Sequence, residues 1–105
     1  MASGRSTHSD RLRTIAMVHE RYGIVIDPHT ADGLLVALQN RDRAVPMICL
    51  ETALPVKFAE TIVEAIGVPP PRPSAFDGIE GRPQRFETID ADAAVLKDYI
   101  ARHAC

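Results

Sequence analysis

The sequence lacks the features that mark several classes of protein. It has no strong charge of one sign, because 12 Lys and Arg stand against 14 Asp and Glu for a formal net charge of -2. Nothing in its electrostatics therefore indicates nucleic acid or an anionic membrane as a partner. It has no apolar run near the roughly 20 residues that a membrane helix needs. Its first residues lack the apolar core of a secretory signal.

Cysteine is scarce, and the two that are present suggest no disulfide framework. Cys49 lies in the apolar run of residues 47–50, which predicts a buried and inert thiol. Cys105 ends the sequence, so we expect it to be frayed. This usage, without a secretory signal, favours a cytoplasmic location.

Metal-binding patterns are also missing. There is no cysteine pair for zinc, and no two histidines have the spacing of a zinc-binding helix. Asp27, His29 and Asp32 could in principle hold a metal. A helix cap explains Asp27 without one, so we expect no metal site.

Apolar residues at helical spacing predict four helices. They cover about residues 10–22, 28–40, 55–66 and 92–102. Ser9 is placed to cap the first helix, and Asp27 followed by Pro28 is a strong start for the second. Gly23 and Gly67 are expected to end the first and third helices.

Between these helices, two segments have the composition of strands. Residues 45–50 are apolar at nearly every position, which is typical of a parallel strand covered on both faces, and residues 85–89 form a weaker candidate. Residues 24–26 are a short extended run, and residues 69–73 are a stiff proline-rich spacer. Two strands rarely make a stable sheet. The sequence therefore predicts an α/β fold, mostly helices around one or two short strands, whose other strands lie elsewhere.

Several stretches resemble threonine synthases of the bacterial and fungal type. They are residues 6–15 leading into Tyr22 and Gly23, residues 27–33 (Asp-Pro-His-Thr-Ala-Asp-Gly), residues 50–59 (Leu-Glu-Thr-Ala-Leu-Pro-Val-Lys-Phe-Ala), and residues 78–80 through 90–92. The resemblance covers nearly the whole chain and corresponds to about the final quarter of the family's sequence. Residues 1–105 are thus identified as one C-terminal segment of the enzyme's cofactor-binding region, with a proline-rich connector and loop at residues 68–83.

The resemblance implies a fold, a reaction and a site. The family converts O-phospho-L-homoserine and water to L-threonine and phosphate, using pyridoxal phosphate in a fold of type II, like the β-subunit of tryptophan synthase. Thr52 would hydrogen-bond the pyridine nitrogen of the cofactor, since a neutral hydroxyl can donate to an unprotonated ring nitrogen. A carboxylate there would favour a protonated ring and a stronger electron sink. The alternative is that Thr52 caps the helix that begins near Pro55.

The same resemblance places Asp27, His29 and Thr30 beside the cofactor pocket, behind the groups that touch the cofactor. The alternative is that Asp27 is a helix cap and His29 a surface residue. Many relatives have Ser-Thr-Ala-His-Pro where residues 51–55 read Glu-Thr-Ala-Leu-Pro. Leu54 cannot transfer a proton, so any role of that histidine is lost here.

Two requirements of a pyridoxal-phosphate enzyme are not met by this chain. Lys57 and Lys97 are its only lysines, both expected on solvated helix faces, and its six glycines never cluster into a phosphate-binding turn. We therefore expect one wall of a cofactor site, with no catalytic residue, no cofactor held and no activity by this chain alone. The expected partner is the missing N-terminal part of the enzyme or a second copy of the chain.

Two other functions stay open from the sequence. One is a stand-alone, non-catalytic interaction or oligomerisation module derived from that enzyme. The other is a small independent enzyme that uses the neighbourhood of Asp27, His29 and Thr52.

Overall fold

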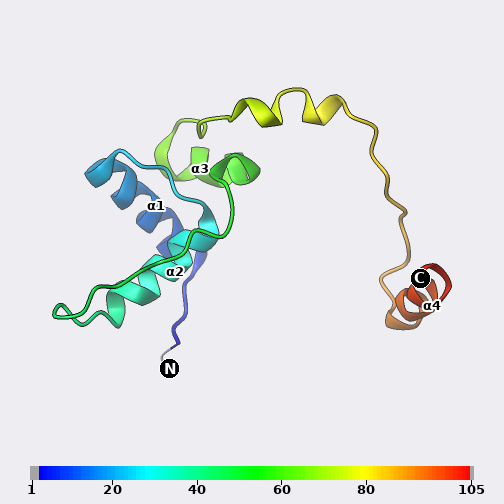
Figure 1. Cartoon of the computed structure of the whole chain (residues 1–105), viewed down its shortest axis with the longest axis horizontal. Coiled ribbons are helices and arrows are strands. Elements are labelled where there is room, and N and C mark those ends of the chain that lie inside the picture. The colour runs from blue at the N-terminus through cyan, green and yellow to red at the C-terminus, as the bar shows by residue number, and fades with distance from the viewer. Residues whose placement is uncertain (1–2, 105) are drawn as a thin grey trace.

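The computed structural model describes residues 3–104, so the frayed end expected at Cys105 lies outside the described residues. Four α-helices follow one another along the chain (Figure 1). They are α1 (His8–Tyr22), α2 (Pro28–Gln39), α3 (Ala59–Ile66) and α4 (Ala93–His103). Three short 3-10 helices lie between α2 and α4, namely η1 (Pro55–Phe58), η2 (Ser74–Phe76) and η3 (Ile79–Gly81). The four predicted helices are therefore all present.

Helix α1 begins slightly earlier than the sequence suggested. Its cap is Thr7 rather than Ser9, because Thr7 and Asp10 form a reciprocal capping box. The Thr7 hydroxyl accepts from the Asp10 backbone N–H at 3.2 Å, and the Asp10 carboxylate accepts from the Thr7 N–H at 3.0 Å. Gly23 ends the helix in a left-handed conformation, with φ of 68°. The expected cap at Ser9 was wrong, since Ser9 lies inside the first turn.

Helices α1, α2 and α3 pack together, with α1 against both of the others, and we call them the three-helix unit. The buried apolar side chains come from all three helices and the link before α2: Ile15, Val18, Ile26, Ala31 and Ile62. A hydrogen bond of 3.0 Å between the His8 ring and the Glu64 carboxylate adds a surface link from α1 to α3.

The expected strand at residues 45–50 is not a strand. It runs back beside α2, where a Cβ added at Gly33 would lie 3.5 Å from the Cys49 sulfur. Its apolar side chains stay exposed, and Ile48 reaches 82%. Cys49 is also exposed, so its expected burial was wrong.

The expected strand at residues 85–89 is likewise absent, and Phe86 there is 78% exposed. The reason is the same for both segments. A strand needs a hydrogen-bonded neighbour, and no two segments within residues 3–104 pair as strands.

Beyond α3 the chain leaves the three-helix unit. Arg72 holds the turns η2 and η3 together through a 2.7 Å ion pair with Glu80 and a hydrogen bond to the carbonyl of Phe76. A link of residues 82–92 without regular structure then leads to α4, which lies apart from the other helices in Figure 1. We call residues 82–103 the C-terminal arm.

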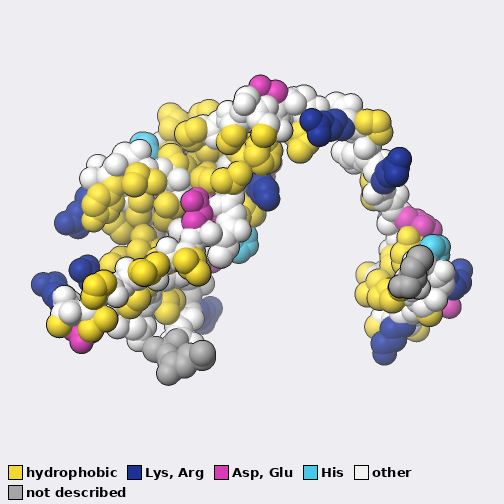
Figure 2. All heavy atoms as spheres, viewed as in Figure 1, with side chains coloured by type: hydrophobic (Ala, Val, Ile, Leu, Met, Phe, Trp, Pro, Cys, Tyr) yellow, Lys and Arg dark blue, Asp and Glu magenta, His cyan; other side chains and the backbone are white. Residues whose placement is uncertain are grey.

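The protein leaves far more surface open than a compact domain of its size. Its accessible surface is 8423 Å², whereas a compact monomer of this mass has about 5,800 Å². Its radius of gyration is 18.4 Å, against about 13 Å for a compact chain of this length. Figure 2 shows hydrophobic side chains spread over the visible surface.

No helix within residues 3–104 is long and apolar enough to cross a membrane. The cytoplasmic location stays a prediction.

Candidate functional site

The start of α2 is built around a buried carboxylate. Asp27 is fully buried and caps the helix, accepting a hydrogen bond of 2.9 Å from the backbone N–H of His29. The hydroxyl of Thr30 donates to the second carboxylate oxygen. Burial alone would raise the pKa of Asp27, but hydrogen bonds from Thr30 and His29 outweigh it and lower the pKa. Asp27 is therefore a buried, ionised helix cap, as one sequence interpretation had it.

His29 is held by this carboxylate but faces solvent. Its Nδ1 lies 3.2 Å from the Asp27 carboxylate, and 61% of its side chain is exposed. The ring meets the edge of Phe58 with centroids 5.0 Å apart. When Nδ1 donates to Asp27, the lone pair of Nε2 is available to accept a proton or a hydrogen bond.

Thr52 lines an open hollow of about 300 Å³. The other lining residues are Glu51, Ala53, Leu54 and Lys57, and we call this feature the 51–57 hollow. No side chain caps η1, so the alternative reading of Thr52 as a helix cap is wrong. The Thr52 side chain is exposed at the hollow, where a ligand could accept its hydroxyl proton.

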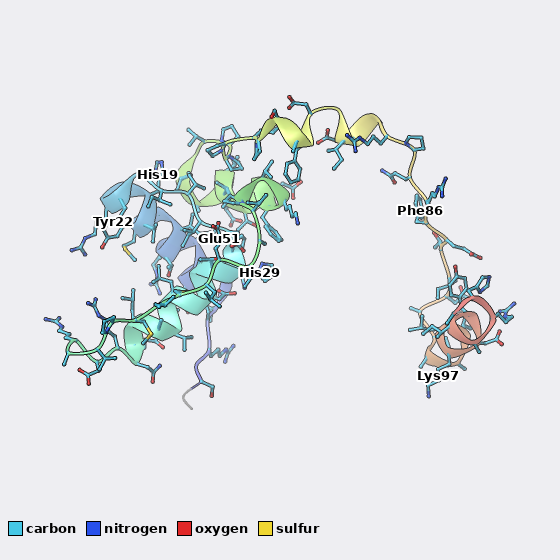
Figure 3. All side chains as sticks on the ribbon, in the orientation of Figure 1. His19, Tyr22, His29, Glu51, Phe86 and Lys97 are labelled. Carbon is cyan, nitrogen blue, oxygen red and sulfur yellow. The ribbon has the colours of Figure 1, made fainter. Side chains whose placement is uncertain are left out.

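Phe58 connects the two halves of the site. It ends η1, next to Lys57 of the hollow, and its ring packs on His29 at the start of α2. The structure therefore brings together Asp27, His29 and Thr30, and joins them through Phe58 to the helix that follows Thr52. Figure 3 shows His29 and Glu51 among the side chains of this region.

An ion pair sets the position of α2 on α1. Arg11 donates to the Asp32 carboxylate from Nε, which lies 3.1 and 3.2 Å from its two oxygens, and from a terminal nitrogen at 2.7 Å. Burial alone would raise the pKa of Asp32, but hydrogen bonds from Arg11 and Ser6 lower it overall. The sequence reading missed this pair, because two residues 21 positions apart give no local signal.

The sequence reading also missed two members of the site. Lys57 lines the hollow, whereas it was expected only on a solvated helix face, and Phe58 supports His29 although the sequence reading assigned it no role in the site. The signal was available for Lys57, which lies five residues after Thr52 across a helix start. No signal in one sequence pairs Phe58 with His29.

The residues present fit only part of a pyridoxal phosphate. The exposed hydroxyl of Thr52 can donate a hydrogen bond to a nitrogen at the edge of the cofactor ring. Among the residues that the structure describes, Lys57 is the one lysine at the hollow, and no glycine lines it to form a phosphate cradle. Lys97 lies on α4, apart from the three-helix unit (Figure 3). The described residues also contain no cluster of three or more His, Cys, Asp or Glu that could hold a metal.

The fold and site thus define a helical unit that offers part of a binding site and leaves much apolar surface uncovered. The family model "Threonine synthase, C-terminal" matches residues 30–100, and the chain belongs to that family.

Individual relatives agree with this assignment. A threonine synthase of Methylobacillus glycogenes is 56% identical over 101 residues, which are 96% of this chain and 21% of that protein. One of Corynebacterium glutamicum is 56% identical over 100 residues, with 94% and 21% covered. The crystal structure of a pyridoxal-phosphate-bound threonine synthase of Brucella melitensis matches with a TM-score of 0.77 at 31% identity, covering 98% of this chain and 22% of that one. The chain spans about a fifth of the length of these relatives.

Proposed function

We propose that this chain is the C-terminal part of a threonine synthase and forms one wall of its cofactor site. The reaction is the conversion of O-phospho-L-homoserine and water to L-threonine and phosphate. The observation that carries the proposal is the exposed Thr52 in the 51–57 hollow. Family membership supports it, as does the pyridoxal phosphate bound to the threonine synthase of Brucella melitensis.

In this role Thr52 holds the ring edge of pyridoxal phosphate by donating its hydroxyl proton to the pyridine nitrogen. The bound cofactor supplies an electron sink for carbanion chemistry at the amino acid. A neutral donor leaves the ring nitrogen unprotonated and so moderates that sink. The lysine that bonds to the cofactor and the phosphate cradle come from the remainder of the enzyme.

Asp27, His29 and Thr30 act beside the pocket in this proposal. The buried Asp27 fixes the ring of His29, and Thr30 fixes Asp27 through its hydroxyl. His29 then presents Nε2 as an acceptor in the assembled site, and once it has taken up a proton Nε2 can donate to a phosphate oxygen. An unchanged pH profile of kcat after His29→Asn, measured in the chimera described below, would contradict this role.

The same proposal explains residues 45–50. In the longer enzyme they form a strand of a type II pyridoxal-phosphate fold, paired with strands of the N-terminal part. Helix α2 covers one side of this segment, and its exposed apolar side chains face the missing neighbours. Thr52 then follows the end of a strand, where ligands bind in open α/β sheets.

A chimera tests the proposal. The C-terminal residues of the Methylobacillus glycogenes enzyme that match this chain are replaced by it, and phosphate release from O-phospho-L-homoserine is measured. We expect an active enzyme. Thr52→Ala removes one neutral hydrogen bond, which is worth about 1 kcal/mol, and should weaken pyridoxal-phosphate binding about 5-fold. Thr52→Ser should restore binding.

Thr88→Ala is the matched control, because Thr88 is exposed on the link before α4 and lies outside the hollow. A folded chimera that releases no phosphate would refute the proposed function. Equal cofactor affinity in Thr52→Ala and Thr88→Ala would refute the role of Thr52.

A second candidate function is an interaction or oligomerisation module. The observation that favours it is the exposed apolar surface of residues 45–50 and α4. Light scattering of the purified chain separates the two. A stable, concentration-independent oligomer with covered apolar surface supports the module, whereas a monomer that binds hydrophobic dyes supports an enzyme segment.

A further inference from the structure

Helix α4 is well formed but stands alone. The Asp92 side chain caps it by accepting from the backbone N–H groups of Ala94 and Val95, at 2.6 and 3.2 Å. Arg102 pairs with Asp98 one turn before it. No residue of α4 is buried, and no other described helix packs against it. Its ends are thus stabilised locally, while no other helix within the described residues covers its faces.

One face of α4 is apolar. Val95, Leu96 and Ile100 are 37%, 47% and 51% exposed, and with Tyr99 they recur at helical spacing. Figure 2 shows the hydrophobic side chains on the side of α4 that is turned toward the rest of the chain, with charged groups elsewhere. Glu87 of the link raises the pKa of Tyr99 through a hydrogen bond and its charge. The link of residues 82–92 therefore contacts α4, the helix that follows it.

A lone helix of this length needs cover to persist. Helices shorter than about 12 to 15 residues are marginal in water, and α4 has 11 residues. Most helical stability in proteins comes from packing of an amphipathic face. The apolar face of α4 is therefore expected to be seated on another surface in the working protein.

The area of the uncovered surface indicates how large a partner is needed to cover it. The chain exposes about 2,600 Å² more than a compact monomer of its mass. A standard interface covers only about 800 Å² on each partner, so a simple dimer of this chain would leave most of the excess open. The solved threonine synthase aligns with 98% of this chain, arm included, and this region is 22% of that protein. The remaining four fifths of such an enzyme is large enough to cover both the apolar side chains of residues 45–50 and the apolar face of α4.

We propose that α4 is a docking helix that seats Val95, Leu96, Tyr99 and Ile100 on the N-terminal part of threonine synthase, apart from the cofactor site. The proposal rests on the proposed function and names the partner of the C-terminal arm. The link of residues 82–92 spans the distance between the three-helix unit and this second contact. In this proposal the chain contacts the N-terminal part of the enzyme at two places, through residues 45–50 and through α4.

Trypsin cleavage after Arg85 tests the docking. Arg85 is exposed on the link in the isolated chain, where we expect rapid cleavage. In the chimera with the Methylobacillus glycogenes enzyme, docked α4 should protect this bond. The double substitution Leu96→Ala and Ile100→Ala should release α4 and raise the cleavage rate in the chimera roughly 20-fold or more, because cleavage follows the population of the open state.

Lys97→Ala is the matched control, since Lys97 lies beside Leu96 on α4 but off the apolar face. Alanine is the best helix former, so neither variant weakens α4 as a helix. Equal cleavage of the isolated chain and the chimera would overturn the proposal. So would equal protection in the double variant and the control, or a dimer of the isolated chain in which Arg85 is already protected.

This readout is independent of catalysis. An inactive chimera in which Arg85 is protected would refute the proposed function and keep the docking of α4. An active chimera with a freely cleaved link would do the reverse.

Discussion

Replacing Asp27 by alanine should destabilise the three-helix unit more than the loss of an ordinary helix cap. Asp27 is fully buried, caps α2 through the His29 N–H, and accepts the Thr30 hydroxyl, which is itself nearly buried. Alanine removes all of these contacts at once. It leaves the Thr30 hydroxyl without the carboxylate to which it donates, at a nearly buried position.

The magnitude follows from two terms. Loss of an N-cap costs about 1 kcal/mol. A buried hydroxyl left without a partner costs about 1 to 3 kcal/mol more. We therefore expect Asp27→Ala to lower the free energy of unfolding by about 2 to 4 kcal/mol at neutral pH. Asp27→Asn keeps one acceptor oxygen for the His29 N–H and places an NH2 group from which the Thr30 hydroxyl can accept, so it should cost only about 1 kcal/mol.

The assay is urea denaturation of the 105-residue chain, followed by far-ultraviolet circular dichroism. Asp92→Ala is the control, because Asp92 also accepts from two backbone N–H groups but caps the isolated α4. It should reduce the helical signal without moving the midpoint of the three-helix unit. If Asp27→Ala and Asp27→Asn have the midpoint of the unaltered chain, the account of Asp27 as a buried, satisfied charge is wrong.

Three further predictions concern the same unit. Arg11→Met breaks the two-point ion pair with Asp32 and should lower the free energy of unfolding by about 1 to 2 kcal/mol. If the double variant Arg11→Met with Asp32→Leu regains this free energy, the amount regained measures the cost of the unpaired carboxylate. Thr7 and Arg13 lower the pKa of Asp10 to about 2, and the pKa of Asp27 is also lowered. Because these folded-state values lie below the unfolded ones, their stabilisation is present above about pH 4. The Asp10 contribution should disappear as the pH falls toward about 2, and that of Asp27 should also be lost on acidification, which an acid titration of helicity checks. Cys49 is exposed, so a thiol reagent should modify it rapidly in the isolated chain. Under the proposed function residues 45–50 would be covered in the chimera, so the reagent should modify Cys49 slowly there.

The helices could be predicted because their ends are set by neighbouring residues. Asp27 with Pro28 starts α2, Gly23 and Gly67 adopt left-handed conformations where α1 and α3 end, and each signal acts within a few positions. The start of α1 shows the limit of this reasoning. Ser9 and Thr7 are both good caps, and the choice depends on the reach of Asp10 back to Thr7.

The candidate site could be predicted only in its local parts. Asp27, His29 and Thr30 lie within four positions, so one helix start brings them together. The contact of His29 with Phe58 and the pair of Arg11 with Asp32 join residues 29 and 21 positions apart, and they depend on how the helices pack. Periodicity in one sequence says which face of a helix is apolar, and nothing about which helix it meets.

The mismatch at residues 45–50 carries an argument of its own. The run from Val45 to Leu50 is too apolar for an exposed loop, and yet Ile48 and Leu50 are 82% and 76% exposed. A pattern of that kind is stable only where strands pair on both edges and layers cover both faces. The α1 and α2 segments obey their local signals in the isolated chain because helices satisfy their own backbone hydrogen bonds. A strand cannot do so, and its pattern is therefore satisfied only when the neighbouring strands are supplied. The segment whose structure departs most strongly from its sequence pattern is thus the segment at which, under the proposed function, this chain would meet the N-terminal part of a threonine synthase.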